Sequence, residues 1–280
     1  MSTTQVLILG AIAGATIFLG LPVGRIKGLS SQARAGLSAL ATGILIFLLW
    51  DVLTGAVDPI ETALDARHWS RFSTLAALGA GGFALGLMSL VYYSEWMRKR
   101  SHRRASTLVG PGAAATDEFE DRNWLDTLTP GKQLALLIAV GIGVHNFGEG
   151  LAIGQAAAAD QVSLAVTLIV GFALHNATEG FGICGPMSGE GTQPSWRFIA
   201  LLGTIGGLPT FLGTVLGQAW SSEAMSVVFF AIAAGSILYV VQELFIANRK
   251  HGHTVLVMWL VLLGLLLGFA TDFVVSAAGV

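Results

Sequence analysis

Residues 133–157 read QLALLIAVGIGVHNFGEGLAIGQAA, an apolar stretch long enough to cross a membrane, with His145 and Glu149 near its middle. Histidine and glutamate are costly inside a bilayer, so a pair of them at the centre of a predicted span indicates a functional site. The pattern returns in the next apolar stretch, where HNFGEG at 145–150 becomes HNATEG at 175–180. These two motifs predict adjacent transmembrane helices that carry a metal site at the membrane midplane.

The composition agrees with a membrane protein. Of the 280 residues, 54% are hydrophobic and only 11% are charged, and the mean hydropathy is +0.71. These values lie far outside those of soluble domains and predict an all-α, polytopic membrane protein. The single cysteine, Cys184, excludes an intramolecular disulfide. The first residues, MSTTQ, lack the basic segment of a cleaved signal, so we expect the first apolar stretch to remain as a span.

A hydropathy scan at about 20 residues per helix gives eight predicted transmembrane helices in a single domain that covers residues 1–280. The predicted helices run from Val6 to Val23, Leu37 to Val57, Thr74 to Tyr93, Gln133 to Ala157, Val162 to Met187, Phe198 to Ala219, Ala224 to Ala247 and Val255 to Ala277. We therefore expect an integral, multi-pass protein of the plasma (inner) membrane.

The basic residues predict the orientation. Most of them fall in the connectors after the odd-numbered helices: Arg25, Lys27, Arg34, Arg98, Lys99, Arg100, Arg103, Arg104, Arg122, Lys132, Arg197, Arg249 and Lys250. The opposite side carries only Arg67 and Arg71. The positive-inside rule then places these connectors in the cytosol and both termini on the non-cytoplasmic side. The long connector, 95–132, is predicted to be a mobile cytosolic loop because it is strongly charged and poor in apolar residues.

The order of the helices has a mechanical implication. Three predicted helices precede the motif pair and three follow it, and the two triples start on opposite sides of the membrane. Such a 3+2+3 arrangement with inverted flanking triples is a usual basis of alternating access.

The motif spacing predicts how the polar side chains meet. Residues i and i+4 share one face of an α-helix, so His145 projects with Glu149, and His175 with Glu179. Two facing helices then offer two imidazoles and two carboxylates, a plausible shell for Zn, Fe, Cu or Ni. The neighbouring amides belong to Asn146 and Asn176. They can complete this shell, form an adjacent site or only link helices.

A purely structural role is the alternative for any one of these residues. A single intramembrane histidine or asparagine is often an interhelical hydrogen-bonding group. Here four positions repeat at one constant offset, and two of them are acids that would each cost about 2.5–3.5 kcal/mol at the bilayer centre without partners. The repetition therefore favours a metal site.

The two motifs resemble those of the ZIP metal-ion transporters, whose fourth and fifth spans carry patterns similar to HNFGEGLAIG and ALHNATEGFGI. The resemblance implies eight spans, outer termini and uptake of divalent ions toward the cytosol, with the metal as substrate and no cofactor. The implied ions are Zn²⁺ first, then Fe²⁺, Mn²⁺ or Cd²⁺. In the bacterial branch, the matching positions line the metal site: His145, Asn146, Glu149, His175, Asn176 and Glu179.

The chain departs from that family pattern in ways that affect the metal count. The prolines usual inside the motifs are replaced by Gly148 and Thr178. Some two-metal members have aspartate where this chain has Asn176, and many have glutamate where Leu208 precedes Pro209. Two anionic ligands are thus missing, and we expect one tightly held ion.

Three further residues are candidates for the transport route. Asp51 is predicted at the outer end of the second helix, where it would either attract cations or serve as an interfacial helix-end residue. Glu243, preceded by Gln242 near the inner end of the seventh helix, resembles a family segment and would hold an ion on release.

Two other functions were weighed. An intramembrane zinc hydrolase usually needs three protein ligands, an open water position and an additional acid or base, and the HExxH spacing of many zinc proteases is absent, so we expect no enzyme. A metal-gated sensor would bind the same ion without net flux. The partners we expect are divalent ions and membrane lipids, with no nucleic acid, and the chain is either monomeric or a homodimer.

Overall fold

The computed structural model describes residues 2–26, 30–107, 124, 128–158, 169, 173, 176–177, 179–187, 193–219, 222–249 and 252–277. All regular secondary structure in these ranges is helical, which confirms the all-α fold class. The helices are α1 (Thr3–Ala15), α2 (Ile17–Gly20), the 3₁₀ helix η1 (Leu21–Arg25), α3 (Ser31–Asp65), α4 (Trp69–Thr107), α5 (Pro130–Ala158), the 3₁₀ helix η4 (Gly185–Met187), α7 (Trp196–Ala219), α8 (Glu223–Arg249) and α9 (Thr254–Ala277).

Seven segments among the described residues are long and apolar enough to cross a membrane, which confirms a multi-pass membrane protein. The remaining predicted span, Val162 to Met187, lies in large part outside the described residues. Its described parts at 176–177 and 179–184 are helical and lead into η4. The 3+2+3 order and the inverted relation of the triples stay predictions.

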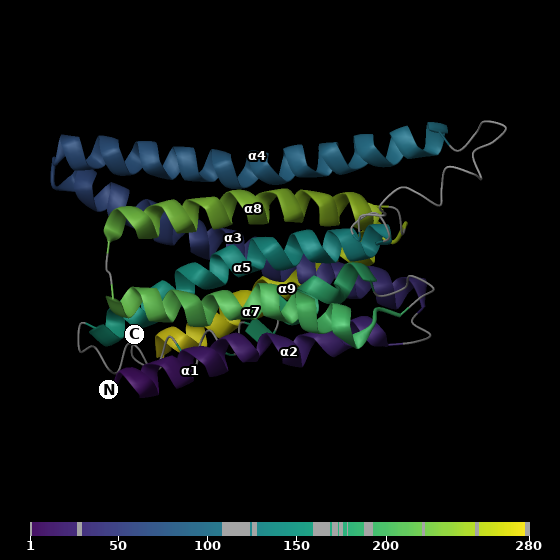
Figure 1. Ribbon diagram of the computed structural model, residues 1–280, viewed down its shortest axis with the longest axis horizontal. Helices are drawn as coiled ribbons and strands as arrows, with labels where there is room; N and C mark the ends of the chain where they lie inside the picture. The colour runs from purple at the N-terminus through teal and green to yellow at the C-terminus, as the bar shows by residue number, and fades with distance from the viewer. Residues whose placement is uncertain are drawn as a thin grey trace.

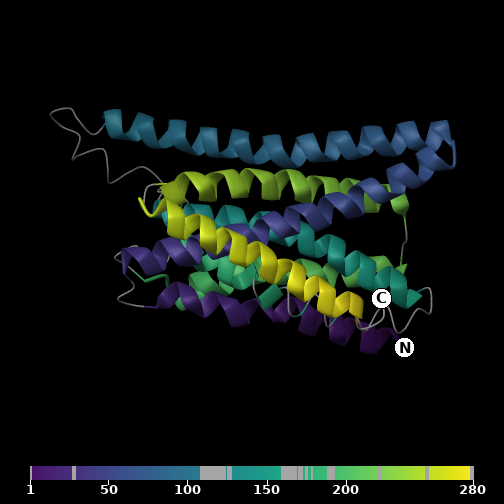
Figure 2. The ribbon, with the colours of Figure 1, turned by 180° about the vertical axis from the view of Figure 1, so that it is seen from behind.

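The helices run along the long axis of the molecule (Figures 1 and 2). The start of α1 and the end of α9 lie at one end of the bundle, together with the α3–α4 turn; we call this the terminal end. The opposite end, the basic end, carries helix termini with basic residues: Arg25, Lys132, Arg197 and Arg249. Lys99 lies in the last third of α4, toward the same end. The long helices run between these two ends, as expected of a chain that crosses a membrane repeatedly.

Two helices are longer than the sequence predicted. The apolar pattern of the second span ends at Val57, yet α3 continues to Asp65, and α4 continues through Thr107 instead of giving way to a loop at Glu95. Hydropathy marks the part of a helix that fits the bilayer, whereas glutamate, alanine, arginine and lysine beyond it still favour helix. The predicted mobile loop therefore starts with helical residues, and its positions 108–123 and 125–127 lie outside the described residues.

The first predicted span is divided into α1, α2 and η1 by a turn at Thr16. The Thr16 hydroxyl donates to the carbonyl oxygen of Ala13 at 2.6 Å, and the Thr16 N–H also points to it, at 3.3 Å. One carbonyl thus takes two donors from a residue three positions later. The Thr16 N–H also keeps its regular helical bond to the Ile12 carbonyl oxygen, at 3.1 Å, so the helix is disturbed only locally before α2 begins at Ile17.

The described helices form two groups that are built by close glycine contacts. In the first group, α5 packs mainly against α7, and α7 also contacts α1. In the second group, α4 packs against α8, and α3 packs against α8 and α9. A Cβ built on Gly150 of α5 would lie 2.1 Å from the Thr210 carbonyl oxygen of α7, and one on Gly86 of α4 would lie 2.0 Å from the Ile232 carbonyl oxygen of α8. Backbones inside each group are therefore in direct contact, as small residues allow in membranes.

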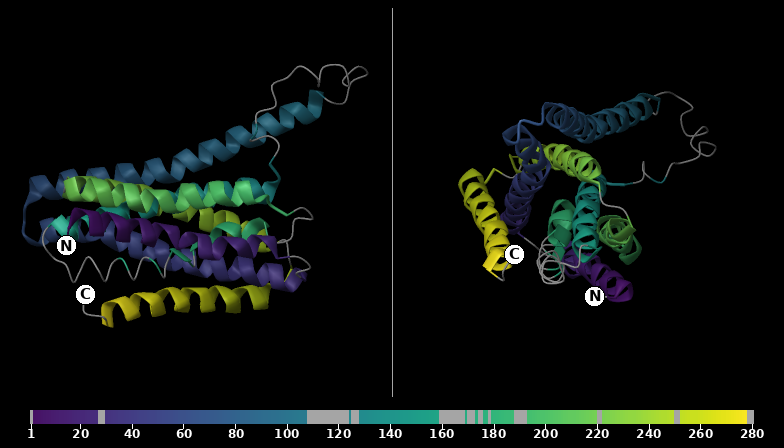
Figure 3. Two further views of the ribbon diagram at one scale, coloured as in Figure 1. Left: turned by 60° about the horizontal axis from the view of Figure 1, so that its bottom comes forward. Right: turned by 90° about the vertical axis from the view of Figure 1, so that its left-hand side faces the viewer.

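The seam between the two groups is packed differently. It is formed where α5 meets α8 and where η4 meets α3. A Cβ built on Gly141 would lie 3.6 Å from the Ser236 Cβ, and one on Gly182 would lie 3.8 Å from the Ala41 Cβ. These are ordinary side-chain contacts. The end-on view in Figure 3 shows α4 and α9 at the periphery and α5 in the middle of the bundle.

Candidate metal site

The first motif lies on the most enclosed span. In the apolar window of α5, 67% of the residues are buried, compared with 22% for α9. Pro130 occupies the first position of α5, where its missing N–H and fixed φ favour a helix start. The helix then carries the first motif to the interior, where His145, Asn146 and Glu149 are at most 2% exposed.

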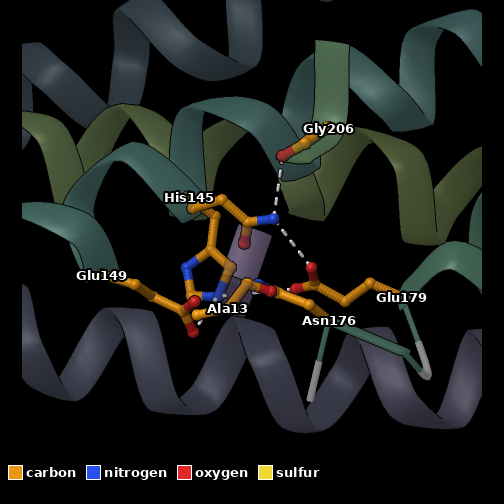
Figure 4. Close-up of polar contacts among 7 residues, drawn as sticks. Ala13, His145, Glu149, Asn176, Glu179 and Gly206 are labelled. Atoms are coloured by element: carbon orange, nitrogen blue, oxygen red, sulfur yellow. Dashed lines mark hydrogen bonds and ion pairs between the residues drawn. The ribbon is translucent and has the colours of Figure 1, made fainter. Parts of the chain in front are cut away.

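Side chains of both motifs meet in this interior, as Figure 4 shows. His145 Nε2 lies 3.1 Å from Glu149 Oε1 on the same helix and 3.7 Å from Glu179 Oε1 of the second motif. Glu179 and Asn176 are also buried, at 1% and 0% exposure. The i, i+4 relation and the approach of the two motifs are thus observed for the residues that the structure describes.

The separations of these atoms suit ligands of a common ion. Two atoms that each lie about 2.1 Å from one zinc ion at the tetrahedral angle are about 3.4 Å apart. The two distances from His145 Nε2, 3.1 Å and 3.7 Å, fall on either side of this value. A small adjustment of the two carboxylates would therefore suffice to face one ion.

Asn146 is held by two acceptors. Its Nδ2 donates to Glu179 Oε2 at 3.0 Å and to the carbonyl oxygen of Gly206 in α7 at 2.9 Å. Its Oδ1 is buried and has no hydrogen-bond partner among the described residues. The two donations fix the amide so that its oxygen remains available for a cation.

Asn176 is held in a similar way from α1. Its Nδ2 donates to the Ala13 carbonyl oxygen at 3.0 Å, beside the interruption at Thr16. Its Oδ1 is also buried without a hydrogen-bond partner in the described part of the chain. Leaving a buried amide oxygen unpaired costs about 1–3 kcal/mol, so two such atoms beside a histidine and two carboxylates indicate a site for a cation.

The described part of the cluster is not a complete metal site. Within the residues that the structure describes, no group of three or more His, Cys, Asp or Glu side chains could hold a metal ion. The fourth predicted ligand, His175, lies outside those residues. The donor set of imidazole, carboxylate and amide oxygen is nevertheless of the kind that divalent transition metals accept.

Comparison with known proteins decides the family. A family model described as ZIP Zinc transporter matches residues 94–276, more than half of the chain. The chain belongs to the ZIP family. A zinc transporter ZupT of Corynebacterium glutamicum is 29% identical to it over 258 residues, which cover 86% of this chain and 90% of the relative. A zinc transporter ZupT of an Enterobacter species is 30% identical over 244 residues, which cover 85% of this chain and 84% of the relative.

Membership of the ZIP family confirms three predictions from the sequence. The chain is a divalent metal-ion transporter and not an enzyme, zinc is supported as a transported ion, and the protein is an integral, multi-pass membrane protein. The resemblance drawn from the two motifs was therefore correct.

The structure places the predicted route residues of this ZIP protein on α3 and α8. Asp51 was predicted at the outer end of its span, but α3 continues beyond it for about four turns, so it lies inside the helix and is half-buried. Gln242 is exposed. Glu243 is half-buried and contacts the Tyr239 hydroxyl, which also contacts Ser94 of α4. Glu243 thus lies at the α4–α8 contact of the second group.

Sequence reasoning missed two backbone groups of the site. The carbonyl oxygens of Gly206 and Ala13 orient the two asparagine amides, although they come from helices without polar motifs. A backbone carbonyl is present in every residue, so the sequence does not mark it. The one sequence signal near these groups is Pro209, three residues after Gly206 in α7; the interruption of α1 beside Ala13 is visible only in the structure.

Proposed function

We propose that this ZIP protein moves divalent transition-metal ions, zinc first, into the cytosol through a site near the membrane midplane. Iron, manganese and cadmium are further candidates as substrates. The ligand set is formed by both motifs: His145, Asn146, Glu149, His175, Asn176 and Glu179.

The observation that carries this proposal is the pair of oriented amides. Asn146 and Asn176 each give their Nδ2 to a backbone carbonyl and keep a buried Oδ1 without a hydrogen-bond partner among the described residues. Acceptors behind a ligand fix its orientation and tune its affinity in known metal sites. An interhelical hydrogen-bonding role would need only the donor side of each amide.

The charge of the cluster supports one ion at a time. Glu149 and Glu179 supply two negative charges, which balance one divalent cation. A second cation about 4 Å away would be repelled strongly in a medium of low dielectric constant. The chain has no acid at Asn176 or Leu208 to offset that repulsion.

The two helix groups support alternating access as the mechanism. Backbone contacts hold each group together, whereas the seam consists of side-chain contacts, among them that of Gly141 with Ser236. We propose that the first group, with the ion, slides along the second group as a rigid body. Such a movement opens the site first to one side and then to the other.

Inward transport requires the basic end to face the cytosol. The basic helix termini at that end support this orientation through the positive-inside rule. In a Cys184→Ala background, a cysteine at Ser2 should react with an impermeant thiol reagent in intact cells, and one at Lys99 should react only after permeabilisation. The reverse labelling would overturn the direction of transport.

Flux into proteoliposomes tests the function itself. Purified protein should carry zinc down an imposed gradient, with iron, manganese and cadmium measured in parallel. The Glu149→Gln variant should insert into the liposome membrane normally but lose the flux. Saturable zinc binding without flux would instead support a sensor.

A further inference from the structure

A phenylalanine of α8 lies between the two helix groups beside the first motif. A Cβ built on Gly148 of α5 would lie 2.8 Å from Phe230 Cε1 and 3.0 Å from Cδ1. A Cβ built on Gly55 of α3 would lie 3.3 Å from Phe230 Cδ2 and 3.4 Å from Cε2. Opposite edges of one ring therefore contact two glycines, one from each group.

The position of this ring along the bundle is on the terminal-end side of His145. Phe230 is about 10 Å along α8 from Glu223 at the terminal end and about 28 Å from Arg249 at the basic end. Its contact, Gly148, immediately precedes Glu149 and is nearly one turn closer to the terminal end than His145. The contact of the ring with α5 is thus on the terminal-end side of His145 and level with Glu149.

The surroundings of the ring are apolar. The ring is half-buried and packs against the main apolar core, whose buried residues include Val52 of α3 and Ala234 of α8. A hydrated ion cannot cross such a layer cheaply, and apolar constrictions close pores to ions by excluding water. The layer closes only if the space between the two glycines is filled.

The adjacent phenylalanine provides a contrast. The Phe229 ring packs against the Phe147 ring of α5 in a tilted arrangement, with ring centroids 4.7 Å apart and planes at 55°. Phe229 thus also bridges α8 and α5, but by pairing with another aromatic ring. It is a matched control, because it is the same residue type at the next position of the same seam.

We propose that Phe230 is the outer gate of the transport path. Its ring fills the space between Gly148 and Gly55 and closes the metal site from the outside, and it leaves this space when the first group moves along the second. A ring in contact with both groups loses one of the contacts in such a movement. The proposal rests on the metal site and orientation proposed above. It also explains why Gly148 has no side chain, since the ring occupies the space that a Cβ would need.

Thiol accessibility tests the gate without requiring transport. In a Cys184→Ala background, a cysteine introduced by His145→Cys lies on the basic-end side of Gly148 and is probed with an impermeant reagent from the outside. Adding Phe230→Ala should raise the alkylation rate by about tenfold or more, because a water-filled opening replaces a dry layer. Adding Phe229→Ala should leave the rate within about twofold. Equal rates with and without the Phe230 ring would overturn the proposal.

Compensation between the two contact residues gives a second test. Gly148→Ala pushes a Cβ into the ring and should slow zinc flux by about tenfold, the size expected of an overpacked contact. Phe230→Leu lacks the ring edge that meets this Cβ, so the double variant should recover at least about half of the original flux. A double variant as slow as Gly148→Ala, with unchanged thermal unfolding, would contradict the gate.

Failure of the gate and failure of the metal site give different results. If Glu149→Gln still carries zinc, the metal site is wrong, whatever the alkylation rates are. If Glu149→Gln abolishes flux but Phe230→Ala does not change alkylation, only the gate is wrong.

Discussion

The two helix groups use the same packing but bury different chemistry. Every buried histidine and carboxylate among the described residues lies in α5 of the first group or, at Glu179, in contact with α5. The second group buries only neutral polar side chains, for example Asn248, which donates to Thr42 Oγ1 at 3.2 Å. Its ion pair, Arg71 with Glu223, lies at the terminal end, where the two side chains are 43% and 40% exposed. The first group is thus suited to carry an ion and the second to form an apolar wall.

The largest effect should come from the charge inside the first group. Glu149→Gln should lower zinc flux by about 100-fold or more, because removing one partner from a buried charged cluster costs about 3–5 kcal/mol. The measurement is zinc uptake into proteoliposomes at equal protein density. Glu61→Gln, an exposed acid of α3 in the second group, is the control and should keep its flux. Equal losses for both variants would remove the distinction between the groups.

The two asparagines, Asn146 and Asn176, should differ in how much they contribute to the free energy of unfolding. Asn146→Asp loses two donations and sets a carboxylate against Glu179, so its metal-free unfolding free energy should fall by about 3 kcal/mol. Asn176→Asp loses one donation to Ala13 and should fall by about 1–2 kcal/mol. Thermal unfolding in detergent, with and without zinc, measures both.

Zinc should restore much of the stability of both aspartate variants, because a divalent ion neutralises the added charge. Asn176→Asp should also strengthen binding of a second ion, which equilibrium binding would detect. The single-ion idea fails if the unmodified protein already holds two equivalent ions.

The sequence predicted the parts of the molecule that depend on composition and local spacing. The apolar stretches located the spans, and the i, i+4 rule placed His145 beside Glu149. It did not predict the length of α3, because helix propensity continues beyond Val57 where hydropathy stops. The orientation of Asn146 depends on a carbonyl oxygen 60 positions away in α7, and no local pattern contains that information.

Substitution of glycines should show that packing is alike in both groups. A Cβ on Gly213 would lie 2.2 Å from the Phe147 carbonyl oxygen in the first group, and one on Gly235 would lie 2.2 Å from the Phe83 carbonyl oxygen in the second. Alanine at either position should cost about 2 kcal/mol of stability. Gly141→Ala at the seam should cost less than about 0.5 kcal/mol, since its Cβ has room. A large loss at Gly141 would show that the seam is not a loose contact.

The smallest effect should come from the exposed ion pair of the second group. Glu223→Gln should shift thermal unfolding slightly, and the shift should vanish at high salt because exposed pairs are screened. Arg25 of η1, a 3₁₀ helix that contacts α7 of the first group, is the comparison. It donates to the carbonyl oxygen of Pro194 and lies 4.6 Å from the centre of the Trp196 ring, so Arg25→Gln should have a larger effect that persists in salt. Equal salt sensitivity would contradict this ranking.

The peripheral place of α4 has a consequence for how the chain is made. Its main partner, α8, begins at Glu223, more than a hundred residues after α4 ends. At about 5–20 residues per second, α4 waits in the bilayer for several seconds or longer before that partner is synthesised. The helices of the first group are complete once α7 ends at Ala219, so the ion-carrying half can assemble while the ribosome is still producing the wall against which it will move.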